Sequence, residues 1–248
     1  RICNNLVETF MNKILITIDT DWAPEFVLRE VSNLLIKSKV KSTWFITHKS
    51  NVIENLKKIP KLFEIGLHPN FLPGSTHGKV ENEILKNVSQ LCPNAQSIRT
   101  HGLYQSSNLL IKISQFLPKI TTDVSLFMPD AENLKPFYLQ TYHNKVIKRI
   151  GYVWEDDYEM EKKNQCWDVN KFLNIDGISI INFHPIHIFL NSVDNSKYLK
   201  VKEKYPNIKK SSENYLKSLI NEGVGAKTMF LSCLKFLETK KSYMISEI

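Results

Sequence analysis

The sequence has no long apolar run, and this absence excludes a class of protein. No segment of the 248 residues approaches the roughly 18 uninterrupted apolar residues that a membrane-spanning helix needs. The first ten residues, RICNNLVETF, also lack the basic start, apolar centre and small-residue cleavage site of a secretory signal. These absences predict a cytoplasmic protein without a transmembrane segment.

Arginine is scarce although the chain is basic. The formal net charge is +8, but 29 of the 33 cationic residues are lysine and only four are arginine. Base reading and bidentate phosphate contacts favour arginine, and lysine pairs such as Lys57-Lys58 and Lys209-Lys210 are scattered along the chain. We therefore expect a lysine-rich solvated surface and no nucleic-acid partner. The long-range positive field still allows attraction to anionic substrates or peripheral contact with an anionic membrane surface.

Cysteine spacing and linker segments are also missing. The four cysteines lie far apart without any C-x-x-C spacing, which excludes a zinc knuckle and a dithiol redox site. No linker rich in Pro, Gly or Ser divides the chain, and no internal repeat is present. We interpret residues 1–10 as an N-terminal extension, because Met11 stands directly before the first strand pattern, and residues 11–248 as a single domain.

Short apolar runs alternate with longer amphipathic segments through most of the chain. This pattern is typical of a parallel sheet or barrel with crossover helices. Seven strands are predicted, at 13–19, 42–47, 62–68, 96–101, 119–127, 146–154 and 177–184. Helices are predicted at 25–38, 51–58, 80–91, 107–116, 169–174, 212–220 and 226–239. The fold class is therefore α/β, with seven or eight β/α units.

Polar or titratable side chains stand at the carboxyl ends of nearly all the predicted strands. In barrels of parallel strands these ends meet at one rim, where the loops converge and chemistry collects. A single strand-end Asp often caps a helix and a lone His often bonds to the backbone, but ten such residues at the ends of six strands on one rim indicate a functional site. The residues are Asp19, Asp21, His68, Arg99, His101, Asp123, Glu155, Asp156, Asp157 and His184.

Asp19 and Asp21, which end the first predicted strand, can serve two purposes. Residues two apart on an extended segment point the same way, and the following turn can separate them. One carboxylate can then bind a metal while the other remains free as a base. With His68 and a second imidazole, Asp21 would form a two-histidine, one-carboxylate site with open positions. A metal there lowers the pKa of bound water from 15.7 toward about 7, which suits amide or ester hydrolysis.

These motifs resemble those of the polysaccharide deacetylases of the NodB-homology type, carbohydrate esterase family 4. The family's T-F-D-D is matched by residues 17–21 with one residue inserted, E-I-G-x-H by residues 64–68, and L-x-L-H loosely by residues 181–184. The resemblance covers roughly residues 13–187 and implies a distorted (β/α)7 barrel that binds a divalent metal. Similar chains act in bacterial surface-polysaccharide and O-antigen biosynthesis, which implies a sugar intermediate as substrate.

The resemblance also implies the catalytic roles. Asp19 would be the general base, and Arg99 would position it. His184 would be the general acid that protonates the leaving amine. A buried guanidinium beside a carboxylate fixes its orientation, which agrees with the role that the family gives to the arginine.

The third metal ligand is where the sequence departs from the family pattern. Asp21 and His68 match the first two ligands, but Leu72 occupies the position of the second histidine in the E-I-G-x-H-[ST]-x-x-H motif. His77, in the glycine-containing loop that follows, is the expected replacement. If His77 points away, His101 or a water molecule takes the third position.

The remaining polar and aromatic residues at the strand ends are expected to line a substrate groove. The family places an Asp near the catalytic histidine, and both Asp123 and the 155–157 segment match that role. The indoles of Trp22 and Trp154 are candidates to stack on a sugar ring. The expected substrate-binding residues are Trp22, His101, Asp123, Trp154, Asp156 and Asp157.

The sequence predicts a metal-dependent hydrolase that removes an acetyl or similar acyl group from an N-acylated sugar. The expected metal is Zn²⁺, although Fe²⁺, Co²⁺, Ni²⁺ and Mn²⁺ also suit two imidazoles and a carboxylate. One alternative is a glycosyltransferase in which Asp19-Thr20-Asp21 holds a metal on a nucleotide-sugar diphosphate. Another is a carbohydrate-binding protein that keeps the barrel without catalysis.

Overall fold

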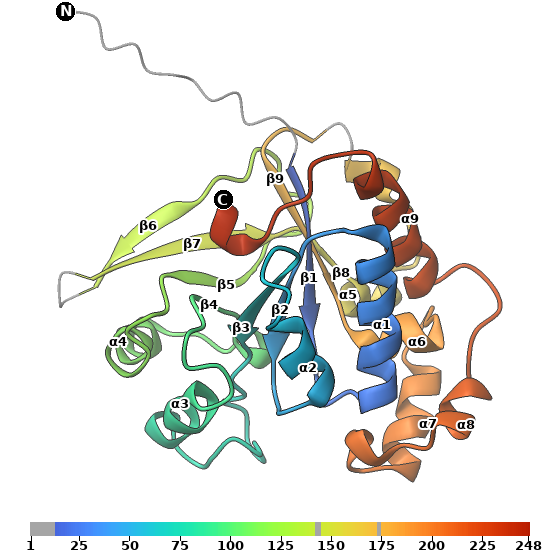
Figure 1. Ribbon diagram of the computed structural model, residues 1–248, viewed down its shortest axis with the longest axis horizontal. Coiled ribbons are helices and arrows are strands. Elements are labelled where there is room, and N and C mark those ends of the chain that lie inside the picture. The colour runs from blue at the N-terminus through green and yellow to red at the C-terminus, as the bar shows by residue number, and fades with distance from the viewer. Residues whose placement is uncertain (1–12, 142–144, 173–174) are drawn as a thin grey trace, which may run out of the picture.

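The computed structural model describes residues 13–141, 145–172 and 175–248, and a nine-stranded sheet runs through them (Figure 1). The expected extension, residues 1–10, lies outside the described residues. The strands are β1 (Lys13–Asp19), β2 (Ser42–Ile46), β3 (Phe63–Leu67), β4 (Ser97–Ile98), β5 (Thr122–Phe127), β6 (Phe137–Gln140), β7 (Val146–Tyr152), β8 (Trp154–Glu155) and β9 (Ile178–Phe183).

Helices connect most of these strands. The α-helices are α1 (Glu25–Ser38), α2 (Asn51–Leu56), α3 (Glu81–Ser89), α4 (Ser107–Phe116), α5 (Asp156–Glu161), α6 (Pro185–Leu190), α7 (Ser196–Lys204), α8 (Glu213–Lys217) and α9 (Ala226–Glu238). Four 3₁₀ turns are described, η1 (His101–Leu103), η2 (Val169–Phe172), η3 (Ile208–Lys210) and η4 (Ile245–Glu247). Within the described ranges, none of the helices combines the length and apolarity needed to cross a bilayer.

The sheet is parallel except at β6. One continuous segment of the chain, β7 followed by β8, pairs with strands near both edges of the sheet. The strand order is β6-β7-β5-β4-β3-β2-β1-β9-β8, with β6 antiparallel to β7. Tyr152 of β7 pairs with Phe127 of β5, and two residues later Trp154 of β8 pairs with Ile181 of β9. The chain from β7 to β8 therefore joins the two sides and curls the sheet into a distorted barrel. The described residues thus form a barrel of seven parallel strands, with the consecutive strands β7 and β8 counted as one.

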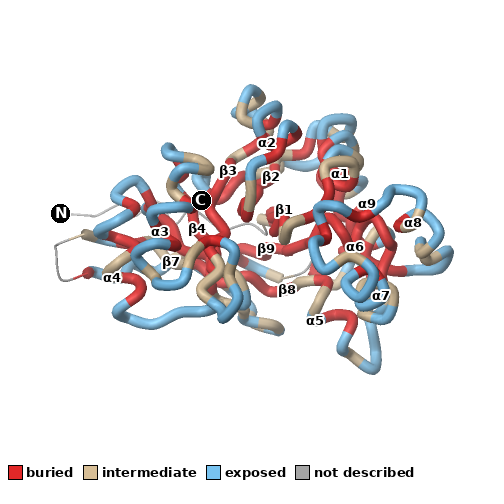
Figure 2. Tube along the Cα trace, turned by 90° about the horizontal axis from the view of Figure 1, so that it is seen from below, coloured by how far each residue is buried: buried red, intermediate tan, exposed pale blue. Residues whose placement is uncertain are grey.

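Side chains alternate between the inside and the outside of the barrel. In β1, Ile16 and Ile18 pack outward in the core formed with the helices, whereas Leu15, Thr17 and Asp19 face inward. Figure 2, seen from below, shows the buried strands in the middle with α1, α2, α3 and α6 around them. The same alternation turns Gly66, His68, Ser97, Arg99, Asn182 and His184 inward.

Gly66 shows how tightly the interior is filled. A Cβ atom at this position would lie 2.7 Å from ring atoms of Phe45 and from Ser97 Oγ. Real Cβ atoms do not approach neighbours that closely, so only glycine fits. The glycine of the E-I-G-x-H segment therefore allows β3 to pack against the interior of the barrel.

The predicted elements agree well with the observed ones near the site. The bounds of β1, α1 and α4 are those predicted. The predicted strand 146–154 is divided into β7 and β8 by a break at Val153. Strand β6 and helices α5, α6 and α7 were not predicted. The predicted helix 169–174 reduces to the turn η2, which ends at Phe172, and residues 173–174 lie outside the described range.

The C-terminal segment closes the amino end of the barrel. Ile245 of η4 is fully buried in the interior cluster that includes Phe45. Its backbone N–H donates to Thr43 Oγ1 at 3.0 Å, and the N–H of Ser246 donates to Glu64 Oε2 at 2.8 Å. Figure 1 shows the C-terminus on the upper side, whereas the β1 arrow points to the lower side. The carboxyl ends of the strands therefore form the open end.

Ile245→Ala is expected to lower the free energy of unfolding by about 2–5 kcal/mol, because it leaves a cavity in the sealed end of the barrel. Leu231→Ala, on the exposed face of α9, is the matched control and should change stability by less than about 0.5 kcal/mol. Chemical denaturation of both variants and the wild type measures the difference. Equal stability of the two variants would show that η4 does not seal the core.

Candidate functional site

Asp21, His68 and His101 place three ligand atoms around one point at the open end of the barrel. Asp21 Oδ1 lies 3.2 Å from His68 Nε2 and 3.3 Å from His101 Nδ1, and the two nitrogens are 3.4 Å apart. Ligands bonded to Zn²⁺ at 2.0–2.1 Å in tetrahedral to octahedral arrangements lie about 3.0–3.4 Å from one another. Asp21 Oδ1 is buried and lacks a hydrogen bond of acceptable geometry. This group, called the ligand group below, therefore fits a divalent cation.

Neighbouring groups fix the orientation of the ligand group. His68 Nδ1 lies 2.7 Å from the carbonyl oxygen of Arg99, so its N–H donates there and Nε2 faces the ligand group. Burial raises the pKa of Asp21, but the imidazoles of His101 and His68 hold it well below its ordinary value. Burial lowers the pKa of His101, and the neighbouring carboxylate of Asp21 raises it above its ordinary value overall.

The turn after β1 presents Asp21 in an uncommon conformation. Its φ angle is 37°, and that of Trp22 is 56°, so both lie in the left-handed region. The N–H of Trp22 donates to Thr47 Oγ1 at 3.0 Å, and Thr20 Oγ1 lies 3.1 Å from the same hydroxyl. These bonds to the loop after β2 hold the turn, which separates the carboxylate of Asp21 from that of Asp19.

His77, the expected third ligand, lies outside the ligand group. Its Nδ1 accepts a hydrogen bond from the N–H of Asn70 at 3.0 Å, and its Nε2 lies 2.7 Å from the carbonyl oxygen of Thr47. Burial lowers the pKa of His77, which agrees with a neutral ring that donates from Nε2. Both ring nitrogens are used by the backbone, so the structure brings His101, the stated alternative, into the group in its place.

Asp19 lies beside the ligand group without belonging to it. Its Oδ1 is 3.1 Å from Arg99 Nη1, and its Oδ2 accepts a hydrogen bond from Asn182 Nδ2 at 2.9 Å. The Oδ2 atom also lies 3.9 Å from His68 Nε2. The carboxylate is thus held in one orientation at the edge of the group, as a base beside a metal would require.

His184 faces the ligand group from β9. Its Nδ1 lies 2.6 Å from Asp156 Oδ1, and its backbone N–H donates to Asp156 Oδ2 at 2.8 Å. The opposite nitrogen, Nε2, lies 3.7 Å from Asp21 Oδ2. Burial lowers the pKa of His184, but the carboxylates of Asp157 and Asp156 together raise it well above its ordinary value. Asp156 is fully buried and therefore orients His184 rather than lining the groove.

Asp123 and Trp154, which were also expected to bind substrate, face outward and therefore lie away from the groove. Asp123 is buried and accepts a hydrogen bond from Arg149 Nε at 2.7 Å and one from Ser125. Trp154 is 1% exposed, and its Nε1 donates to Glu159 Oε2 at 2.7 Å. Neither side chain has a surface left for a sugar, so both expectations are corrected.

Two connected cavities open at the rim. The inner cavity of about 290 Å³ is lined by Asp19, His68, Arg99 and Glu155, among others. The outer cavity of about 490 Å³, called the outer groove below, is lined by Trp22 and extends to α7 and η3. Both cavities are lined by Asp21, His101, Asp157 and His184. The ligand group therefore lies where the two cavities meet.

The sequence interpretation missed Asn182 and His187 and gave Glu155, one of its strand-end residues, no specific role. Asn182 bonds to the carboxylate of Asp19, and strict alternation along β9 would have turned it inward. His187 Nε2 lies 2.9 Å from Asp157 Oδ1, a pairing between α6 and α5 that no spacing revealed. Glu155 lines the inner cavity and accepts a hydrogen bond from Tyr152 Oη, and burial raises its pKa to about 7.

Comparison with known proteins agrees with this geometry. A family model described as WbmS-like polysaccharide deacetylase matches residues 16–202. The structure of WbmS from Bordetella bronchiseptica, provisionally described as a polysaccharide deacetylase involved in O-antigen biosynthesis, is 30% identical. The match covers 95% of both chains with a TM-score of 0.79. A 4-α-glucanotransferase from Thermococcus litoralis is 11% identical, over 95% of this chain and 38% of that one, with a TM-score of 0.52, and shares the fold alone. No curated protein matches the chain at a significant level.

The mostly parallel barrel with histidines and carboxylates at its open end defines the class as the polysaccharide deacetylases. Within that class, the chain belongs to the WbmS-like polysaccharide deacetylase family. The expected resemblance to carbohydrate esterase family 4 is confirmed at the level of family and fold.

His101→Ala is expected to weaken divalent metal binding by at least about 100-fold, because it removes one of three ligands. His77→Ala should retain the metal with a change of less than about tenfold, because its nitrogens bond to the backbone. Titration of the chelator-treated proteins with Zn²⁺ or Co²⁺, followed by elemental analysis, measures both. Loss of the metal in His77→Ala with retention in His101→Ala would reverse the assignment.

Proposed function

We propose that this protein is a metal-dependent hydrolase that removes an acetyl or similar acyl group from an N-acylated sugar. The observation that carries the proposal is the position of the ligand group between two differently held groups, Asp19 and His184. The description of the Bordetella relative favours a substrate from O-antigen or other surface-polysaccharide synthesis. The mechanism follows from the residues of the two cavities.

Asp21, His68 and His101 would hold the metal, with Zn²⁺ the first candidate and Fe²⁺, Co²⁺, Ni²⁺ or Mn²⁺ also suited to the donor set. A divalent ion bound there would polarise the acyl carbonyl and lower the pKa of water. The chain itself supplies the proton transfers and the orientation of the reacting groups.

Asp19 would accept the proton of the attacking water. Arg99 and Asn182 hold its two oxygens from opposite ends, so the carboxylate cannot rotate away from the rim. The carboxylate lines the inner cavity, so it can reach a water molecule there without moving.

His184 would donate a proton to the leaving amine. Asp156 accepts from its Nδ1, which leaves the Nε2 proton directed at the point where the cavities meet. The raised pKa favours the protonated imidazole that a general acid needs. Two titratable groups with opposite tasks thus flank the acyl group.

The glycosyltransferase alternative fits these contacts less well. A D-x-D site would need both carboxylates on the metal, whereas both oxygens of Asp19 are bonded to Arg99 and Asn182. The alternative of a carbohydrate-binding protein without catalysis predicts saccharide binding that chelators do not change. It would be supported if metal-loaded protein bound sugars but released no acetate.

Asp19→Asn is expected to lower acetate release by at least about 100-fold, because general base catalysis contributes about 10²–10⁴ in rate. Metal content should stay at the wild-type level, since Asp19 is not in the ligand group. Acetate released from a panel of N-acetylated sugars and metal measured on the same preparation provide the two readouts. Unchanged turnover would remove Asp19 from the mechanism.

Asp156→Asn is expected to lower kcat by at least about tenfold and to move the alkaline limb of the pH profile to lower pH. The carboxylate raises the pKa of His184, and a general acid stops working above its pKa, so its loss shortens the active range. Asp130→Asn, at an exposed turn, is the control. An alkaline limb in the same place for wild type and Asp156→Asn would contradict the assignment of His184 as the acid.

A further inference from the structure

The outer groove continues well beyond the ligand group and ends at lysines. Its far wall is formed by Tyr198 and Lys202 of α7, Lys209 of η3 and Asn207, which directly precedes η3. The volume of about 490 Å³ lies within the roughly 300–1,000 Å³ typical of pockets that bury a drug-sized ligand. An acyl group at the ligand group would occupy only one end of this space.

Neither lysine of the far wall is neutralised. Among the described residues, no carboxylate lies within ion-pair distance of Lys202 or Lys209. Lys202 Nζ lies over the ring of Tyr198, 4.6 Å from its centroid, which places the ammonium group beside the groove wall. Burial and the charge of Lys209 together lower the pKa of His48 to about 4, so this ammonium lies close to the loop after β2.

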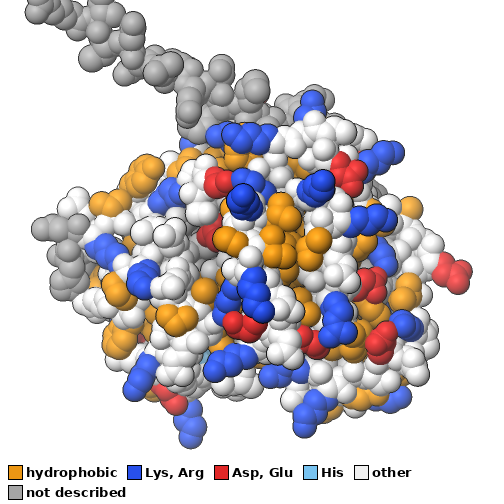
Figure 3. All heavy atoms as spheres, viewed as in Figure 1, with side chains coloured by type: hydrophobic (Ala, Val, Ile, Leu, Met, Phe, Trp, Pro, Cys, Tyr) orange, Lys and Arg blue, Asp and Glu red, His pale blue; other side chains and the backbone are white. Residues whose placement is uncertain are grey.

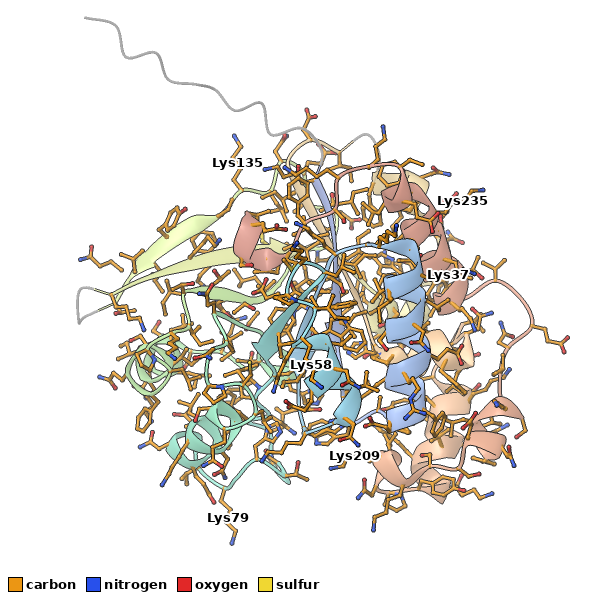
Figure 4. All side chains as sticks on the ribbon, viewed as in Figure 1. Lys37, Lys58, Lys79, Lys135, Lys209 and Lys235 are labelled. Atoms are coloured by element: carbon orange, nitrogen blue, oxygen red, sulfur yellow. The ribbon has the colours of Figure 1, made fainter. Side chains whose placement is uncertain are left out.

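The two ends of the groove differ in charge. The carboxylates that line it are Asp21 and Asp157, and histidines contact both of them. Among the described residues no arginine lines the groove, so an anion there would meet lysine ammonium groups, which can hold a phosphate as point charges without bidentate geometry. Figure 4 shows Lys209 on the lower side of the molecule, and Lys37 and Lys235 away from it.

We propose that Lys202 and Lys209 bind a phosphate or diphosphate that is joined to the acylated sugar. The inference rests on the proposed function, because it takes the acyl group to lie at the ligand group. It adds the chemical class of the carrier and assigns two specificity-determining residues. The sugar would then lie between Trp22 and Tyr198, with its acyl end inward and its phosphate end against η3.

The first test uses inorganic pyrophosphate as a probe and does not depend on catalysis. Calorimetric titration of the chelator-treated protein excludes binding through a metal. Wild type should bind pyrophosphate, and Lys202→Gln/Lys209→Gln should raise the Kd by about tenfold or more, since hydrogen bonds to charged groups contribute strongly. The matched control is Lys37→Gln/Lys235→Gln, which removes the same charge from exposed positions on α1 and α9.

The proposal is overturned if wild type does not bind pyrophosphate, or if the two double variants have equal affinity. Equal affinities lower than that of the wild type would mean that net charge alone attracts the anion. Matching circular dichroism spectra and melting temperatures of the two variants exclude misfolding as the cause of a difference.

The second test separates the two sources of such a phosphate. Acetate release is measured from a uridine diphosphate N-acetylhexosamine, from a polyprenyl diphosphate N-acetylhexosamine in phosphatidylcholine vesicles, and from the free sugar. The kcat/KM for the sugar on its natural carrier should exceed that for the free sugar. Lys202→Gln/Lys209→Gln should lower the ratio of these two kcat/KM values by about tenfold. If no sugar releases acetate, the proposed function fails while the titration still tests the lysines. Acetate release with an unchanged ratio overturns the lysine assignment alone.

Discussion

The buried guanidinium of Arg99 connects several strands inside the barrel. Removing a charge from water costs several kcal/mol, so a side chain that is 1% exposed needs an opposite charge and further hydrogen bonds. Asp19 supplies the charge, and the rings of Phe45 and Tyr152 lie 4.6 and 4.3 Å from the guanidinium carbon. The guanidinium also donates hydrogen bonds to Thr17, on the same strand as Asp19, and to Val124 and Asn182 on β5 and β9. One cation therefore joins opposite sides of the barrel directly below the open end and holds the carboxylate that the proposed mechanism uses as its base.

Strand alternation explains how much of the site could be predicted from the sequence. Alternation along β1 and β9 turns Thr17, Asp19, Asn182 and His184 inward, and the carboxyl ends of parallel strands share one rim. The rule of strand ends therefore found most of the site. It did not consider whether each side chain faces the inside or the outside of the barrel. Val124 faces inward, so its neighbour Asp123 faces outward, although it was expected in the groove. Alternation alone could not have predicted which way Trp154 faces, since the break at Val153 changes the alternation between β7 and β8.

The third member of the ligand group could not be predicted, because His77 and His101 both follow irregular backbone. His101 begins a 3₁₀ turn that continues through Gly102 with φ of 60°, a conformation that favours glycine. His77 is held by the backbone of Asn70 in its own loop and by that of Thr47 in the loop after β2. The unpredicted elements have similarly local causes. Helix α6 is buried on every side and β6 is exposed along its length, so neither has an amphipathic period.

The pairing of charges at the rim determines what remains to attract a substrate. Asp19 is paired with Arg99, Asp21 with two histidines, Asp156 with His184, and Asp157 with His187. Each of these four carboxylates therefore has a nearby donor, and its field is short-ranged. The lysines on α7 and η3 lack such partners among the described residues, so the residual field of the outer groove is positive at its far end. A substrate with a neutral acylated sugar and an anionic carrier would therefore place its carrier at this far end of the groove.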